Sequence, residues 1–464
     1  MLKKKAINLI IGTLFVLSVM VVTFIWPHLD LNISNVTGAT GSITQQNYST
    51  DSDTVRYVIF ISFPLIIFFL SFFYFKKEKV RSFYDLIRYP HFEEQKKFNI
   101  KDISLLLLIF IILEFISLGF PLGPIDTFHD GELLSVAKNS LLTKSFFIDT
   151  YTIHGLSDIF YPLAFWKIFN QETIGAGRSF FLFLILALKF LTIVLAYQIS
   201  KFSFVKNKKI FFIFFSLILI SMSYYQVPIN FSYFSYRDIF IIIFLIFFSH
   251  VFLKQETNLL IKFMLGLVPS IALIMHIDTG TFLFVLLFSY IFYLLINKKT
   301  GDIFTILISI SITWIFLILF FGLEEISNFF KNAITIILSM DYLHGIIYPE
   351  PFLSIGENKN GMRGTRGLLL QLFAGLFVLY HFISKKNNLS NNGKLFFVFL
   401  FFLSFIMYKN ALGRSDSYHI RMSNDLPILI NVFFILNIFL NYFEKKFNLG
   451  EISNKKNLIF LIIL

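Results

Sequence analysis

Residues 303–322 read IFTILISISITWIFLILFFG, a stretch without one charged side chain. A helix of about 20 apolar residues crosses the hydrocarbon core of a bilayer, so this stretch predicts a membrane-spanning helix. The whole chain of 464 residues shares its character, because 56% of the residues are hydrophobic, 19% are aromatic and only 15% are charged. Soluble proteins average roughly 25% charged residues. The composition therefore excludes a water-soluble fold and predicts an all-α, polytopic transmembrane bundle of about 12–13 spans.

The other candidate spans divide the chain into three parts. They lie near 6–26, 56–75, 102–120, 179–200, 210–225, 237–253, 259–277, 279–297, 367–384, 394–408 and 427–443. We expect an N-terminal hairpin with a basic loop over 1–101, a transmembrane core over 102–443, and a basic tail over 444–464. The tail leads into an apolar run that begins at 457, which we expect to be a truncated span or an interfacial segment. Residues 156–169 are amphipathic and predict an interfacial helix in the loop 121–178.

The basic residues predict the orientation of the bundle. One alternating set of loops holds 26 Lys and Arg, and the opposite set holds 13. The richer set belongs in the cytoplasm. We therefore expect a multi-pass protein of a bacterial cytoplasmic membrane, with a cytoplasmic N-terminus and external loops 121–178 and 323–366. The net charge of +12 then reflects membrane topology, and no nucleic-acid partner is expected. The absence of Cys excludes disulfides and thiolate chemistry.

The densest polar motif opens the loop 121–178. It places Asp126, His129, Asp130 and Glu132 within seven residues, directly after a predicted span. Crowded carboxylates at a membrane surface tend to have raised pKa values, which suits general-base work. The alternative is a solvated acidic helix start, with Asp126 as its cap.

Further polar residues lie at the external ends of spans. They are Asp149, His154 and Arg178 in the same loop, Arg237 and Asp238, and His276 and Asp278. Charged groups at this depth usually face a bundle interior or a cavity. A hydrogen-bonding loop histidine and a local Arg237–Asp238 ion pair are the alternatives. His276 and Asp278 are also candidate ligands of a divalent metal, Mg²⁺ or Mn²⁺, although the spacing fixes no ligand set.

The last external loops are unexpectedly basic. Residues 409–421 contain Arg414, Asp416, His419 and Arg421, and residues 356–367 (GENKNGMRGTRG) add Arg363 and Arg366. Guanidinium groups match phosphate oxygens, so these residues predict an anion site. The four glycines of 356–367 favour a mobile loop that acts as a lid. Carboxylates and Arg/His groups on one membrane face suit a phosphate-bearing lipid donor, since Gly-rich nucleotide loops are absent.

Over about 102–430 the sequence resembles the GT-C superfamily of polytopic glycosyltransferases, which use polyprenyl-phosphate sugars. The matching motifs are His129-Asp130-Gly131-Glu132, then Asp149 to Gly155, Pro162-Leu-Ala-Phe-Trp-Lys-Ile-Phe, Arg178, and Gly413-Arg414-Ser-Asp416-Ser-Tyr-His419. The acidic loop follows the third span here, whereas in the family it usually follows the first. Residues 1–101 therefore look like an added hairpin.

The resemblance implies an inverting sugar transfer to a lipid, glycan or protein acceptor of the cell envelope. Asp130 would be the base, with Glu132 and Asp126 as alternatives. The donor phosphate would be held by Arg414, His419, Arg421, Arg363 and Arg366. The sugar and acceptor would contact His129, Asp149, His154, Arg178, Arg237, Asp238, His276, Asp278 and Asp416. Tyr224, Tyr225, Tyr233 and Tyr236 could stack on sugars or form an interface belt.

Two other functions remain open at this point. An O-antigen-type polysaccharide polymerase would depend on external Arg residues more than on the acidic loop. A lipid-linked-sugar flippase or transporter would usually show an internal repeat and ionisable groups at mid-membrane. The chain has no clear repeat, and Lys189 is the one charge deep in a predicted span.

Overall fold

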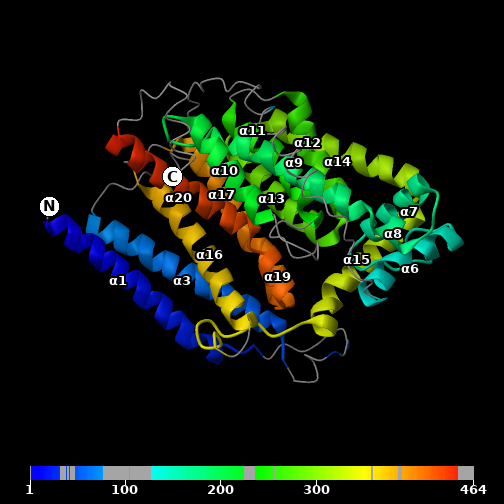
Figure 1. The fold of residues 1–464 in the computed structure, drawn as a ribbon, viewed down its shortest axis with the longest axis horizontal. Helices are drawn as coiled ribbons and strands as arrows, with labels where there is room; N and C mark the ends of the chain where they lie inside the picture. The colour runs from blue at the N-terminus through cyan, green and yellow to red at the C-terminus, as the bar shows by residue number, and fades with distance from the viewer. Residues whose placement is uncertain are drawn as a thin grey trace.

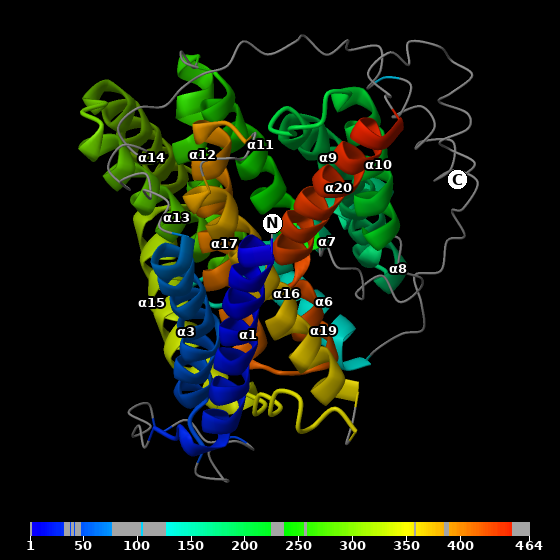
Figure 2. The ribbon, with the colours of Figure 1, turned by 90° about the vertical axis from the view of Figure 1, so that its left-hand side faces the viewer.

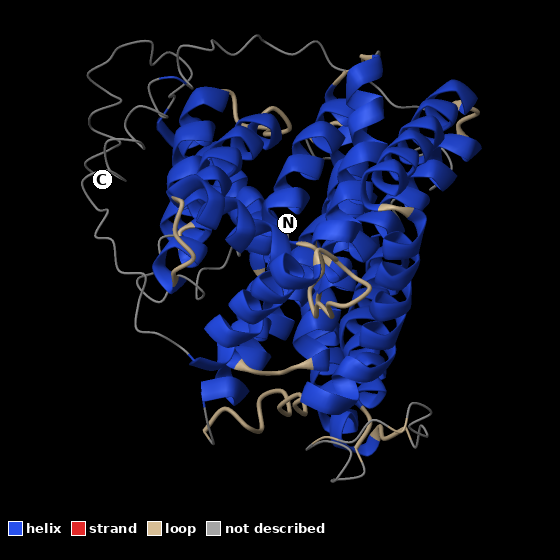
Figure 3. Cartoon of the chain, turned by 90° about the vertical axis from the view of Figure 1, so that its right-hand side faces the viewer, coloured by secondary structure: helices blue, strands red, loops and turns tan. Residues whose placement is uncertain are grey.

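The computed structural model describes residues 2–31, 38, 41, 48–76, 104, 127–223, 236–254, 258–356, 359–384 and 389–447. These residues form helices and loops without a β-strand (Figure 3). A single β-bridge among them joins Ile346 to Arg414. Eight of the described helices are long and apolar enough to cross a membrane. The chain is therefore an all-α, multi-pass transmembrane protein, as the sequence predicts.

The helices follow one another in the order drawn in Figure 1. They are α1 (Leu2–Ile25), η1 (Trp26–His28), α3 (Thr50–Lys76), α6 (Thr127–Thr143), α7 (Ser157–Phe169), α8 (Ile174–Arg178), α9 (Phe180–Ser200), α10 (Lys208–Ser223), η3 (Tyr236–Asp238), α11 (Ile239–Leu253), α12 (Leu259–Met275), α13 (Ile277–Ile296), α14 (Thr300–Phe321), α15 (Leu323–His344), α16 (Lys359–Ile383), α17 (Asn391–Met407), α18 (Lys409–Gly413), α19 (Ser417–Met422) and α20 (Asp425–Phe447).

Two predicted spans, 237–253 and 259–277, form shorter helices than the apolar pattern suggests. Helices α11 and α12 have 15 and 17 residues. Helix α11 begins late because Tyr236–Asp238 forms a 3₁₀ turn. Helix α12 ends where His276 adopts an extended backbone, and α13 starts at the next residue. Hydropathy alone does not detect such breaks inside apolar sequence. The predicted span 102–120 and the run from 457 lie outside the described residues.

The expected lid over 356–367 is wrong where the structure describes it, because α16 begins at Lys359. Its glycines allow close packing. Gly361 packs against the Ser354 carbonyl, and a Cβ on Gly364 would lie 2.6 Å from Pro349 Cγ. The preceding segment 323–344 is also a helix, α15, because its apolar residues recur on one face. The buried members of that face are Ile326, Phe329, Ala333 and Ile336.

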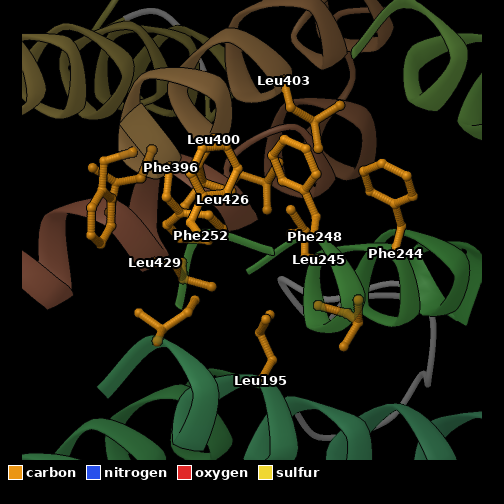
Figure 4. Close-up of a cluster of buried hydrophobic side chains, with 14 of the residues drawn as sticks. Leu195, Phe244, Leu245, Phe248, Phe252, Phe396, Leu400, Leu403, Leu426 and Leu429 are labelled. Atoms are coloured by element: carbon orange, nitrogen blue, oxygen red, sulfur yellow. The ribbon is translucent and has the colours of Figure 1, made fainter. Parts of the chain in front are cut away.

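The largest core lies between α9, α10, α11, α12, α13, α16, α17 and α20. Figure 4 shows rings and leucines from α11, α17 and α20 that interdigitate there, with Leu195 of α9 beside them. The Phe248 ring lies edge-on to Tyr290 at 5.1 Å between centroids. Leu319 is 79% exposed and Phe24 is 74% exposed. Apolar side chains outside the core suit a lipid surround, so close packing rather than escape from water holds these helices together.

The N-terminal hairpin of α1 and α3 lies against the rest of the bundle (Figure 2). Trp26 packs on Tyr348 at 5.7 Å between ring centroids, and Tyr57 stacks on Tyr408 at 4.7 Å. The buried Asp53 carboxylate accepts a hydrogen bond from the Tyr348 backbone N–H at 2.9 Å. The part predicted over 1–101 therefore has its helices α1 and α3 fixed to the core.

One end of the bundle collects the segments predicted to share a membrane face. Helix α1 ends, α3 begins, α15 ends and α16 begins at the lower end of Figure 2, and α19 lies nearby. We call this the site end. Helices α6, α7 and α8 pack on one another at the right of Figure 1, and Phe147 of the α6–α7 loop packs on Phe329 of α15 at 5.1 Å between ring centroids. Helices within the loops between spans were part of the fold prediction, and α7 matches the amphipathic segment 156–169.

Candidate functional site

The first pocket at the site end is lined by three arginines. Arg363 and Arg366 come from the beginning of α16, and Arg421 comes from α19. Their spacing of i and i+3 places Arg363 and Arg366 on one face of the helix. Leu370, Ile420 and Asn424 complete the lining of this arginine pocket, which encloses about 210 Å³, part of it open at the surface. Three predicted phosphate ligands, separated by nearly 60 residues, therefore meet in one place.

Asn424 is the most informative residue of the arginine pocket wall. It is 3% exposed, and its Nδ2 atom donates to the Ile420 carbonyl. Its Oδ1 atom has no hydrogen-bond partner among the described residues. Because buried polar atoms are nearly always hydrogen-bonded, such an atom marks a place where a bound molecule or water completes the set. The sequence analysis missed Asn424, which lies just before an apolar run and carries no charge.

A second pocket lies on the other side of the same segment. Ile420, Arg421 and Asn424 line the arginine pocket, whereas Met422 and Ser423 line the second one. The remaining lining residues are Arg237, Asp238, Asp278, Thr279, Phe282, Met407 and Asn410, and the space is about 310 Å³, part of it open. We call it the acidic pocket. Arg237, Asp238 and Asp278 were predicted from sequence, whereas Asn410 and Ser423 were not.

A chain of polar contacts links Arg237 through His154 to the buried Asp158. Its Nη2 atom lies 2.9 Å from His154 Nε2, and His154 Nδ1 lies 3.1 Å from Asp158 Oδ2. Asp158 is buried on α7. Burial acts to raise the pKa of the Asp158 carboxyl, but His154 and then Arg237 more than offset this and hold the pKa below its ordinary value. The sequence analysis missed Asp158 because it lies inside an amphipathic stretch.

Backbone hydrogen bonds fix this chain of contacts to the α12–α13 junction. Leu156 N–H donates to the Ile274 carbonyl at 2.8 Å, and Ile277 N–H donates to the His154 carbonyl at 2.9 Å. Gly155 has a φ of +123° and lies against the carbonyls of Ile274 and Met275, where a Cβ would overlap them. Only glycine suits that position. The Gly after His154 is therefore what lets the loop of α7 reach the His276 junction.

His276 is fully buried at this junction, and its Nδ1 atom lies 3.1 Å from Ser157 Oγ. Asp278, in the first turn of α13, lines the acidic pocket and accepts a hydrogen bond from Asn410 Nδ2 at 3.2 Å. The two residues of the His276–Asp278 motif thus have different surroundings. Asp149 is exposed on the loop surface and does not line the acidic pocket.

Two buried carboxyl groups meet beside the acidic pocket. Asp238 and Asp425 are electrostatic neighbours and are 6% and 2% exposed. Two carboxylates this close repel each other when both are ionised. The second oxygen of Asp425, Oδ1, has no hydrogen-bond partner among the described residues. Sequence reasoning missed Asp425 because a polar residue directly after Asn424, at the start of a span, looks like an ordinary capping residue.

The late basic motif is held together by Asp416. Its two oxygens lie 3.0 Å from Arg414 Nε and 2.8 Å from His419 Nδ1. Asp416 also caps α19 by accepting from the backbone N–H groups of Tyr418 and His419. Burial acts to raise the pKa of Asp416, but the hydrogen bonds and charge of His419, with Arg414, lower it to about 2. Arg414 and His419 therefore contact Asp416 and do not line the arginine pocket.

The early acidic motif lies on another part of the molecule. Asp130 is buried in the first turns of α6, and its Oδ1 atom lies 3.2 Å from Arg178 Nε at the end of α8. The structure thus joins two predicted residues, and an arginine neutralises the predicted base. Glu132 is half-buried on α6. Asp126, the side chain of His129 and Tyr224, Tyr225 and Tyr233 lie outside the described residues, as does the side chain of Tyr236.

Among the described residues, no three His, Asp or Glu side chains are grouped so that they could hold a metal ion. The metal expectation stays a prediction. Comparisons of the chain with protein-family models, curated proteins and solved structures found no match. The class of protein is therefore defined by the fold and the pockets alone: a multi-pass helical membrane protein with a cationic and an acidic pocket at one end.

Proposed function

We propose that this chain is an integral membrane glycosyltransferase that moves a sugar from a polyprenyl-phosphate donor to a lipid, glycan or protein acceptor of the cell envelope. The arginine pocket carries this proposal. Three guanidinium groups around a partly buried space at a bundle end suit a lipid phosphate, because they neutralise its charge and bind its oxygens in pairs. The positive-inside rule favours the site end as the external face of a bacterial cytoplasmic membrane, with the N-terminus inside.

The proposed reaction is an inverting displacement at the sugar C1. The acceptor hydroxyl oxygen forms a bond to C1 while the bond from C1 to the phosphate oxygen breaks. The hydroxyl proton passes to a carboxylate, and the polyprenyl phosphate leaves with its negative charge held by Arg363, Arg366 and Arg421. Asp130 is the first candidate base, as the resemblance implies, and its Oδ1 atom lies 3.2 Å from Arg178 Nε outside both pocket linings. Glu132 and Asp126 are the alternatives.

The test is transfer from a panel of radiolabelled polyprenyl-phosphate sugars to a membrane lipid extract, using the purified full chain. Arg421→Gln removes a pocket charge, and Asp130→Asn removes the base. We expect Arg421→Gln to lower transfer at least tenfold, since one charge-assisted hydrogen bond is worth about 1.5–3 kcal/mol. Lys331→Gln is the control, because Lys331 is an exposed cation on α15 away from both pocket linings.

The results separate the parts of the proposal. Transfer that Arg421→Gln leaves unchanged at equal folded yield would exclude the arginine pocket as the donor site. Loss of transfer in Asp130→Asn would identify the base, whereas survival would move that role to Glu132 or Asp126. No transfer by wild-type protein from any monophosphate donor would contradict the glycosyltransferase proposal.

One observation favours a second candidate, an O-antigen-type polysaccharide polymerase. Asp130 is paired with Arg178, and the strongest cluster of predicted residues is the arginine pocket. A polymerase that joins pyrophosphate-linked oligosaccharides would need the arginines and would tolerate Asp130→Asn. Chain lengthening of a lipid-pyrophosphate oligosaccharide by both wild type and Asp130→Asn, with no use of monophosphate donors, would select this function.

A further inference from the structure

The acidic pocket differs from the arginine pocket in charge, although only the segment 420–424 separates them. Asp238 and Asp278 line the acidic pocket, and Asp425 and Asp158 lie behind it. Arg237 is the one cationic side chain in its lining. Four carboxyl groups face one guanidinium here, so negative charge exceeds positive charge around this space even when one carboxyl group is protonated. A phosphate is therefore repelled from the acidic pocket and attracted to the arginine pocket.

The lining of the acidic pocket offers hydrogen-bond acceptors, so a ligand that binds there must supply hydrogen-bond donors. Asp278 and Asp238 offer carboxyl oxygens at the pocket wall. Asn410 and Ser423 can both donate and accept hydrogen bonds. A ligand with several hydroxyl groups satisfies this set, because each hydroxyl donates one hydrogen bond and accepts others.

The same lining also offers apolar surface. Phe282, Met407 and Met422 face the acidic pocket beside its polar groups. A sugar ring has hydroxyl groups around its edge and C–H groups on its faces, so it suits a wall that mixes carboxylates with an aromatic ring. A cation would suit the carboxylates alone but would gain nothing from this apolar side, and Arg237 would repel it.

We propose that the acidic pocket binds the uncharged, hydroxyl-bearing carbohydrate group of the substrate while the arginine pocket binds its phosphate. This inference rests on the proposed function and assigns each chemical part of the substrate to one side of the segment 420–424. Asp278 and Asp238, which line the acidic pocket, are the groups that recognise the hydroxyls. The carbohydrate comes either from the donor lipid or from a saccharide acceptor, and the two arms of the test separate these sources.

The first arm measures binding of decaprenyl phosphate, and of decaprenyl phosphate carrying a neutral hexose or pentose, to the full chain in nanodiscs. We expect Asp278→Asn and Asp238→Asn to leave the affinity for bare decaprenyl phosphate unchanged. We expect both to weaken binding of the glycosylated lipid about tenfold or more, since a hydrogen bond to a charged group is lost. Glu324→Gln, which changes an exposed acid of α15, is the matched control and should change neither affinity.

The second arm measures binding of free methyl glycosides while bare decaprenyl phosphate is present at saturation. Dependence on Asp278 and Asp238 in the first arm assigns the pocket to the donor sugar, and dependence in the second arm assigns it to an acceptor. Bare lipid that binds, without such dependence in either arm, would overturn the inference alone. Bare lipid that fails to bind wild type would overturn the proposed donor and the inference with it.

Discussion

Arg237 Nη2 lies 2.9 Å from His154 Nε2. A guanidinium can only donate hydrogen bonds, so His154 Nε2 must accept this one, and the ring proton must lie on Nδ1. Nδ1 faces the carboxylate of Asp158 at 3.1 Å. The contact therefore fixes the tautomer of a neutral His154 and makes Asp158 the anchor of the whole chain of contacts. Arg237 in turn lines the acidic pocket, so the anchor supports the candidate site from a distance.

Replacement of Asp158 should destabilise the protein strongly. Asp158→Ala removes the buried acid and leaves Arg237 with less compensation, a loss that typically costs about 3 kcal/mol or more. We expect the free energy of denaturant unfolding in mixed micelles to fall by this amount. Asp149→Ala in the same loop removes an exposed acid and should change it by less than about 0.5 kcal/mol. Equal effects of the two variants would contradict the anchoring role of Asp158.

Sequence reasoning could find the residues of this network that carry charge at the ends of spans. Arg237, His276 and Asp278 stand out there because charge beside an apolar run is costly. The pairing could not be predicted, since it depends on Gly155 bringing the α6–α7 loop to the α12–α13 junction. Asp425 and Asn424 could not be distinguished from capping residues of the next span. Their burial depends on helices distant in sequence.

The α6–α7 loop should depend on Glu325. Its carboxylate accepts hydrogen bonds from the backbone N–H groups of Phe146, Phe147 and Ile148 at 3.2, 2.5 and 3.2 Å. Glu325→Ala leaves the Phe146 and Phe147 donors without this acceptor, whereas Ile148 N–H keeps Ser145 Oγ at 3.1 Å. We expect the amide hydrogen exchange of Phe146 and Phe147 to rise about tenfold or more, because hydrogen bonds to a charged group are lost. The neighbouring and exposed Glu324 supplies the control Glu324→Ala, which should leave this exchange unchanged.

A methyl group at Gly367 should disturb the arginine pocket by displacing Asn424, which lines it. A Cβ there would overlap the Tyr408 hydroxyl and would lie 2.8 Å from Asn424 Nδ2. We expect Gly367→Ala to lower the free energy of unfolding by about 1–3 kcal/mol, as overpacking in a filled interior does. Gly301→Ala on α14 meets no atom within 4 Å and should be neutral or slightly stabilising. A neutral Gly367→Ala variant would show that α16 can move away from α18 and α19 at little cost.

The glycines of α16 also show where sequence patterns mislead. GENKNGMRGTRG contains four glycines and several polar residues, a composition typical of a mobile loop. The glycines instead allow α16 to lie against Ser354, Pro349 and Tyr408, and they keep Arg363 and Arg366 on a helix. Helix α15 was not predicted from the sequence, because Glu324, Glu325 and Lys331 lower its mean hydropathy. Its buried apolar residues nevertheless recur with a helical period. Transmembrane segments, by contrast, are evident from composition.

Asp416 should give the late basic motif a measurable pH dependence. Burial acts to raise the pKa of Asp416 from its ordinary value of 3.8, but His419, with Arg414, lowers it to about 2 in the folded protein. A lowered carboxyl pKa stabilises the folded state above the unfolded value, and this stability is lost as the pH falls from about 4 to about 2. At pH 7 we expect Asp416→Asn to be about 1–2 kcal/mol less stable than wild type, since the amide keeps the N-cap oxygen but loses the charge that contacts Arg414 and His419. The measurement is thermal unfolding of both proteins in detergent from pH 7 to pH 2. The difference in melting temperature should shrink below pH 4 as the wild-type carboxyl takes up a proton, and a constant difference over this range would show that the charge of Asp416 contributes nothing.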